Sequence, residues 1–191
     1  MTSGKRGTLV VISAPSGAGK TTIAREILRR NPGMEFSVSA TTRPKRIGET
    51  DGKDYHFFSR EEFVRRVKAG EFVEWEEVYG NYYGTLKEEV ERALRSGHHI
   101  LFDIDVKGGV SIKRHYPEAV LIFVMPPSME TLKERLVHRG TEDADTLRQR
   151  LERVPMELEK GKAFDYQVVN DVLERAVAEV QQIVARHLES V

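Results

Sequence analysis

The 191-residue chain contains no cysteine, which excludes disulfide bonds, thiolate metal sites and cysteine nucleophiles. It also carries no net charge, since 30 basic residues balance 30 acidic ones, so a bulk attraction to nucleic acid is missing. Long apolar runs are absent: none reaches the roughly 20 residues of a membrane span, and no signal-peptide core follows Met1. These absences predict a cytoplasmic protein that acts on small charged molecules, with no nucleic-acid or membrane partner. They set no oligomeric state.

The length fits one domain with insertions, and helix-like and strand-like patterns alternate along it. The runs at 99–104 and 119–125 are almost continuously apolar, as in strands that are buried on both faces. This alternation predicts a three-layer α/β fold around a central parallel sheet. The expected helices are 20–30, 60–69, 86–96, 107–115, 128–138, 143–160 and 172–189, and the expected strands are 8–13, 36–40, 55–58, 72–78, 99–104, 119–124 and 166–169.

Two segments interrupt the alternation. Residues 36–85 are aromatic, charged and dense in short strands, which predicts an inserted, mostly antiparallel subdomain. Residues 128–157 are rich in arginine and helical in pattern, which predicts a second inserted segment that covers the functional site. The core would then consist of 1–35, 86–127 and 158–191. Ser59 and Ser128 are expected to cap the helices that follow them.

The most informative segment links an apolar, β-branched run to a helix-period stretch through a loop of small residues. Gly17 and Gly19 let successive backbone N–H groups point at one anion, and a helix that begins near Lys20 adds its unpaired amides. Lys20 can then reach the β- and γ-phosphates, and the Thr21 hydroxyl can bind Mg²⁺. An ordinary glycine-rich turn is the alternative, but strand, helix and Lys-Thr all stand in register. The predicted triphosphate-binding residues are Ala14, Pro15, Ser16, Gly17, Ala18, Gly19, Lys20, Thr21 and Thr22.

A second cluster of cations follows at 41–46, where Arg43, Lys45 and Arg46 surround a proline. Arginine matches phosphate through two parallel hydrogen bonds, although a solvated basic loop is the commoner outcome. Nearby tyrosines at 55, 82 and 83 add phenols, and Tyr82 is expected to be half-buried in a sheet.

Acidic residues offer further candidates. Asp103 ends a buried strand, where its carboxylate can orient Mg²⁺ or brace an arginine; capping the turn into Gly108 is the alternative. Glu74 and Glu76 lie on one predicted strand, and the residues alone do not choose between them. Among the arginines of 128–157, the spacing of four puts Arg135 and Arg139 on one helix face. Arg150 shares its helix with Arg148 and Arg153, so a solvated, ion-paired face is the alternative for these cations.

Several segments together resemble the guanylate kinase family, in order along almost the whole chain from the phosphate loop to Asn170. These segments are Ser37–Arg43, Gly48–Tyr55, Gly80–Thr85, Asp103–Asp105, Arg135–Gly140 and Val169–Asp171. The resemblance implies a P-loop NTPase fold with a GMP-binding subdomain at 36–85 and a helical lid at 128–157. It also implies a Mg²⁺-dependent transfer of the γ-phosphoryl group of ATP to GMP, and to dGMP as well.

The resemblance assigns a role to each matching residue. It implies that Arg43, Arg46, Tyr55 and Tyr83 hold the GMP phosphate, and that Ser39, Glu74, Thr85 and Asp105 read the guanine. It further implies that Arg135, Arg139 and Arg150 close over the transferring group and that Asn170 lies near the donor base. From their positions, Asp103 is predicted to contribute to the substrate site and, with Thr21, to bind Mg²⁺. The chemistry agrees, because carboxylates accept from the N–H donors of guanine and hydroxyls donate to its O6 oxygen.

Two other functions fit the same pattern. One is a kinase of this fold that phosphorylates a sugar phosphate such as ribose 1,5-bisphosphate, for which Glu74 would be dispensable. The other is a non-enzymatic module that binds phosphorylated peptides. The intact loop Gly17–Thr21 and the arginines of 128–157 favour an enzyme over that module.

Overall fold

The computed structural model describes residues 6–78, 80–138 and 144–189. Five parallel strands form the central sheet in the order β2-β7-β1-β8-β9. Their bounds are β1 Leu9–Ser13, β2 Met34–Phe36, β7 His99–Asp103, β8 Val120–Met125 and β9 Tyr166–Val169. Because β1 and β7 are neighbours and parallel, the loops that follow them lie at the same edge of the sheet.

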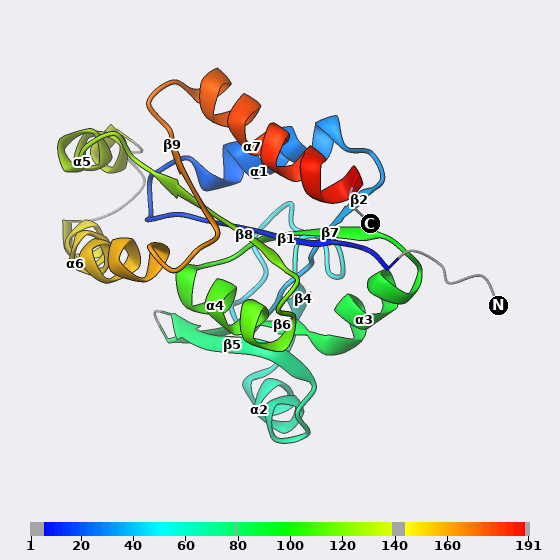
Figure 1. Ribbon diagram of the computed structural model, residues 1–191. Coiled ribbons are helices and arrows are strands. Elements are labelled where there is room, and N and C mark those ends of the chain that lie inside the picture. Colours follow the sequence, from blue (N-terminus) through cyan, green and yellow to red (C-terminus); the bar gives the residue numbers. More distant parts are fainter. Residues whose placement is uncertain (1–5, 79, 139–143, 190–191) are drawn as a thin grey trace.

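Helices cover both faces of this sheet (Figure 1). On one face lie α1 (Lys20–Arg30) and α7 (Leu173–Glu189), and on the other α3 (Lys87–Arg95) and α4 (Val106–His115). Alternate residues of β1 feed the two cores: Val10 and Ile12 pack on the α1/α7 side, and Leu9 and Val11 on the α3/α4 side. The predicted three-layer α/β fold with a parallel sheet is confirmed.

A second sheet has the order β4-β3-β6-β5 and lies beyond α4, with α2 (Arg60–Lys68) on its far side (Figure 1). Its strands are β3 Ala40–Thr41, β4 His56–Phe57, β5 Phe72–Val78 and β6 Asn81–Leu86. Two of its three pairings are antiparallel, and β3 pairs with β4 in parallel. A small aromatic core of Phe63, Phe72 and neighbours joins α2 to this sheet.

The strand expected at 36–40 was wrong as one element. The chain leaves the first sheet after Phe36 and enters the second at Ala40, so the apolar segment serves two sheets. Sequence periodicity cannot detect that change, because both strands are extended.

Two helices project from the end of the sheet where β1 and β8 finish: α5 (Met129–His138) and α6 (Ala144–Gly161) (Figure 1). The predicted caps are confirmed: the Ser59 side chain accepts from the Glu62 amide, and the Ser128 hydroxyl accepts from the Thr131 amide, both at 3.1 Å. Among the described residues, no helix is both long and apolar enough to cross a membrane.

Candidate functional site

The conformation of the loop between β1 and α1 depends on two glycines. Gly17 and Gly19 have φ values of 88° and 95°, a left-handed conformation that residues with a Cβ atom rarely adopt. Gly19 precedes the first turn of α1, and no side chain caps that turn, so its N–H groups are left for an anion. A Cβ atom on Gly19 would also lie 2.4 Å from the Asn170 side chain, so glycine is needed there for space as well.

Asn170 supports this loop from the end of β9. Its side chain is buried, with 4% of the residue exposed, and its Nδ2 group donates to the Ala18 carbonyl at 2.8 Å. Arg135 on α5 in turn donates to the Asn170 carbonyl at 3.1 Å. The loop geometry therefore depends on residues more than 100 positions away.

Lys20 and Thr21, the first residues of α1, meet Asp103 at the end of β7. The Lys20 ammonium lies 2.7 Å from one carboxylate oxygen, and the Thr21 hydroxyl donates to the other at 3.0 Å. This arrangement follows from the parallel pairing of β1 with β7, which brings both strand ends to one edge. The capping role considered for Asp103 belongs instead to Asp105, whose Oδ1 accepts from the Gly108 amide at 2.8 Å.

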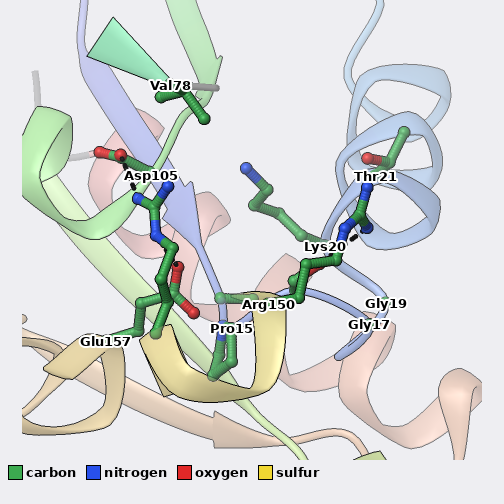
Figure 2. A pocket seen from close by; sticks show the side chains of 12 residues that line it. Pro15, Gly17, Gly19, Lys20, Thr21, Val78, Asp105, Arg150 and Glu157 are labelled. Atoms are coloured by element: carbon green, nitrogen blue, oxygen red, sulfur yellow. Dashed lines mark hydrogen bonds and ion pairs between the residues drawn. The ribbon is translucent and has the colours of Figure 1, made fainter. Parts of the chain in front are cut away.

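A first cavity of about 270 Å³ lies over this loop. In Figure 2 the loop is on one side, and Arg150 and Glu157 of α6 face it from the other. The Arg150 guanidinium donates to the Ser16 hydroxyl at 3.0 Å. Glu157 is 7% exposed, and this burial raises the pKa of its carboxyl. The cavity is lined by Ala14, Pro15, Ser16, Gly17, Gly19, Lys20, Thr21, Val78, Asp105, Arg150, Arg153 and Glu157.

A second cavity, of about 200 Å³, adjoins the first and extends toward the second sheet. The two share Lys20, Val78 and Asp105, so one lysine reaches both. The second cavity is lined by Lys20, Ser39, Tyr55, Glu74, Glu76, Val78, Tyr83, Gly84, Asp103, Ile104 and Asp105.

Carboxylates dominate this second cavity. Glu74 accepts from the Thr85 hydroxyl at 2.6 Å, and burial raises its pKa to about 7. Glu76 lies two residues on, on the same strand face, and binds the Lys107 ammonium at 2.5 Å; burial raises its pKa too. For Asp105, burial opposes ionisation, but the nearby Glu76 carboxyl, the Gly108 amide and Arg153 outweigh it and lower the pKa. Both glutamates therefore face inward.

The predicted phosphate ligands of the second subdomain are only partly brought together. Tyr55 and Tyr83 line the cavity, with ring centroids 6.1 Å apart. Arg43 lies 5.4 Å from the Tyr55 ring centroid but outside the lining, where it binds the Glu49 carboxylate at 2.6 Å. Arg46 is exposed, and its backbone N–H donates to Glu49 at 2.7 Å. Tyr82 is half-buried and packs against the small aromatic core, as expected.

The predicted lid arginines separate. Arg135 lines a third cavity of about 400 Å³, whereas Arg150 lines the first; the two cavities meet at Gly17 and Gly19. Arg139 lies outside the described residues. Thr22 and Asn170 also line the third cavity, which Lys20 does not line.

Sequence reasoning missed two contributors, Arg153 and Glu157, and left Glu76 open as the alternative to Glu74. A solvated, ion-paired position was the alternative considered for Arg148 and Arg153. It describes Arg148, whose side chain is 71% exposed beside Asp145 and Glu152. The side chain of Arg153 is 27% exposed and lies 3.6 Å from Asp105. The spacing of Arg150, Arg153 and Glu157, three and then four residues, places them on one helix face and could have revealed them.

Oxygen ligands for a metal ion are present, although the described residues contain no cluster of three or more His, Cys, Asp or Glu side chains that could hold one. Thr21 and Asp103 place a hydroxyl and a carboxylate within 3.0 Å at the mouth of the phosphate loop. Mg²⁺ binds through one or two such oxygens together with water and substrate phosphates. This donor set fits an ion that arrives with a nucleotide.

Comparison with known proteins gives one consistent result. The family model described as Guanylate kinase matches residues 6–187. Proteins named guanylate kinase from Symbiobacterium thermophilum and Chlorobaculum tepidum are each 50% identical, over 94% and 96% of this chain and 85% and 94% of their own. The crystal structure of guanylate kinase from Anaplasma phagocytophilum superposes with a TM-score of 0.77 at 34% identity, covering 96% of this chain and 87% of that one.

Proposed function

The chain belongs to the guanylate kinase family, and from that premise we propose how its cavities serve the transfer of the γ-phosphoryl group of ATP to GMP, which yields ADP and GDP. The observation that carries the assignment of roles is the pair of adjoining cavities that share Lys20. One is floored by backbone amides and the other is lined by carboxylates and hydroxyls. Two nucleotides bound there would meet with their phosphates at Lys20.

The first cavity takes the triphosphate of ATP. The free amides at the start of α1 and the Lys20 ammonium match its negative charge. The adenine then extends toward Thr22 and Asn170 in the third cavity, where Arg135 is also found. Asn170 acts on this nucleotide indirectly as well, because it holds the Ala18 carbonyl and with it the loop.

The second cavity takes GMP. The N1–H and N2–H₂ groups of guanine donate to Glu74 and Asp105, and Ser39 and Thr85 supply hydroxyls for O6. Adenine presents the opposite pattern on that edge and leaves carboxylates facing acceptors. For the phosphate we propose Tyr55, Tyr83, Arg43 and Arg46. The GMP phosphate replaces the Glu49 carboxylate as the partner of Arg43, since each offers two anionic oxygens to the guanidinium.

The transfer itself is a direct in-line displacement. No general base is required, because the attacking oxygen of GMP is already anionic, and no phospho-enzyme forms. Lys20, Arg43, Arg135, Arg139 and Arg150 stabilise the charge of the transferring group, which is the main contribution a protein makes to this reaction. Closure of the helical lid at 128–157 over the subdomain at 36–85 excludes water, the competing acceptor.

Thr21 and Asp103 are the residues we propose for Mg²⁺. When bound, the ion neutralises charge on the β- and γ-phosphates of ATP. Asp103 also contacts the Lys20 ammonium at 2.7 Å, so this carboxylate positions the lysine as well. We place the reaction in the cytoplasm, because a chain without cysteine does not depend on the disulfide bonds that oxidising compartments allow.

A substrate panel tests the assignment. In a coupled assay with ATP and Mg²⁺, GMP and dGMP should be phosphorylated far better than AMP, UMP or CMP. Rates that are equal across the bases would contradict guanine recognition by Glu74 and Asp105. Activity on ribose 1,5-bisphosphate that survives Glu74→Ala would point to the sugar-phosphate kinase instead.

A further inference from the structure

Arg153 stands where the two cavities meet. It lines the first cavity from α6, yet its charged neighbours include Asp105 and Glu76 of the second. Its Nη2 atom lies 3.6 Å from Asp105 Oδ2 and 3.7 Å from Glu76 Oε1, and its Nε atom lies 3.8 Å from Glu157 Oε1. These distances exceed the reach of a hydrogen bond, so three carboxylates hold the guanidinium by charge alone.

The two carboxylates of the second cavity already have closer partners. Glu76 Oε1 binds the Lys107 ammonium at 2.5 Å, and Asp105 Oδ1 accepts from the Gly108 amide at 2.8 Å. Of the two Asp105 oxygens, Oδ2 is the one that faces Arg153, and the Glu76 carboxyl also hydrogen-bonds to Asp105. Under the proposed function, guanine donates to Asp105. Guanine and Arg153 therefore compete for the same oxygen.

We propose that Arg153 passes from the carboxylates to the phosphates when guanine occupies the second cavity. With that cavity empty, Asp105 and Glu76 hold the guanidinium. Guanine binding satisfies Asp105 Oδ2 and frees Arg153 to turn into the first cavity, beside Lys20 and Arg150. There its planar fork binds a phosphate oxygen of the ATP that lies on the loop.

This reorientation of the Arg153 side chain makes the binding of ATP depend on the binding of GMP. Without GMP, the ATP site lacks one of its cations; with GMP, the site is complete. α6 carries both Arg153 and Arg150, so the two guanidinium groups would then lie on the same side of the first cavity. The inference rests on the proposed function, since it needs ATP in the first cavity and guanine in the second.

Calorimetric titration of a non-hydrolysable ATP analogue tests this coupling, with Mg²⁺ and with or without saturating GMP. In the parent protein GMP should tighten analogue binding about tenfold, within the usual range of coupling between two sites. In Arg153→Gln the same addition should change the dissociation constant by less than about twofold, while binding without GMP stays close to the parent value. Saturating guanosine, which lacks phosphate, should reproduce the tightening in the parent, and adenosine should not.

Two variants on the same helix serve as controls. Arg148→Gln removes an exposed arginine that pairs only with the nearby Asp145 and Glu152 among its described neighbours, so the coupling should persist. Arg153→Lys keeps the charge without the fork and should retain part of it, which also covers a failure of Arg153→Gln to fold. Full coupling in a folded Arg153→Gln, or a parent protein whose analogue binding ignores guanosine, overturns the inference. Absence of GMP phosphorylation by the parent overturns the proposed function itself.

Discussion

The first and second cavities are built in opposite ways, although they share Lys20 and Asp105. The floor of the first comes from one continuous segment, residues 14–21, whose backbone conformation supplies the amides. The lining of the second comes from strands β5, β6 and β7 and the loops around them, and it works through side chains. A phosphate group can be bound by a local fold of the backbone, whereas a base edge needs donors and acceptors assembled from distant parts of the chain.

The charges differ as well. In the first cavity the cations Lys20, Arg150 and Arg153 outnumber the carboxylates Asp105 and Glu157. In the second, Lys20 is joined by four carboxylates, those of Glu74, Glu76, Asp103 and Asp105. If GMP binds there as proposed, its dianionic phosphate lies near carboxylates, and binding is favourable only if the guanine donates to them. Each prediction below alters one cavity and asks whether the other responds.

Lys20→Ala should have the largest effect. Loss of the cation that reaches both cavities should lower kcat by about 10³-fold, because charge stabilisation dominates phosphoryl transfer. GMP binding, measured by calorimetry, should survive. Lys162→Ala, which removes an exposed lysine paired with Glu159, is the control and should leave kcat unchanged. Turnover retained in Lys20→Ala would remove the assignment of the first cavity to ATP.

Glu74→Ala should damage only the second cavity. We expect kcat/KM for GMP to fall by about 10²-fold, the cost of one charged hydrogen bond together with the Thr85 hydroxyl left without its acceptor. The KM for ATP should stay close to the parent value. Glu77→Ala on the same strand provides the control, since Glu77 points to the opposite face with half its side chain exposed. An equal loss in both variants would contradict the inward role of Glu74.

The pH dependence of GMP binding sharpens the same point. Burial raises the pKa of Glu74 to about 7, and only the ionised carboxylate accepts from guanine on both oxygens. The KM for GMP should therefore fall as the pH rises from 6 to 8, by at most about tenfold per unit below the pKa. The part of this change due to Glu74 should vanish in Glu74→Gln, which separates it from titration of GMP itself.

Ionisation of Glu74 favours GMP binding but lowers the stability of the folded protein. Because the folded state binds the Glu74 proton more tightly than the unfolded state, this group lowers the free energy of unfolding as the pH rises from about 4.5 to 7. Urea titrations of the substrate-free protein and of Glu74→Gln across that range would measure the contribution. A contribution that grows with pH would mean that the carboxyl is ionised in the folded protein at neutral pH.

Asn170→Ala should give the smallest effect, confined to the first and third cavities. The lost hydrogen bond to the Ala18 carbonyl should cost about 1–2 kcal/mol of unfolding free energy and raise the KM for ATP several-fold, without changing the KM for GMP. Asn31→Ala removes another amide, which pairs with Gln181 far from the loop. It should lower stability and leave both KM values unchanged. A matching rise in the KM for GMP in Asn170→Ala would show that the cavities are not independent here.

Residues 14–22 illustrate what can be predicted from the sequence. Strand, loop and helix follow one another there, so Gly17, Gly19 and Lys20 were identified from local pattern alone, and the structure has them as expected. The buried strands β7 and β8 could also be predicted from the sequence, because burial on both faces makes a strand continuously apolar.

Other positions had a weaker local signal. Glu74 and Glu76 both face the cavity, and strand alternation cannot tell the inner face from the outer. Arg153 and Arg148 are alike as sequence, yet one is surrounded by carboxylates and the other by solvent. The caps show the same limit: Asp103 and Asp105 are two residues apart, and only the fold separates the carboxylate that binds Lys20 from the one that caps α4.

The sequence by itself determined the phosphate loop, the alternation of helices and strands, and the family, because each of these depends on residues that are neighbours in the chain. The tertiary structure alone decided which acids line the second cavity, which arginines line the first and third, and that Asn170 contacts the loop. Those outcomes depend on how strands from two sheets and a distant helix pack together, because packing brings together side chains that are far apart in the sequence.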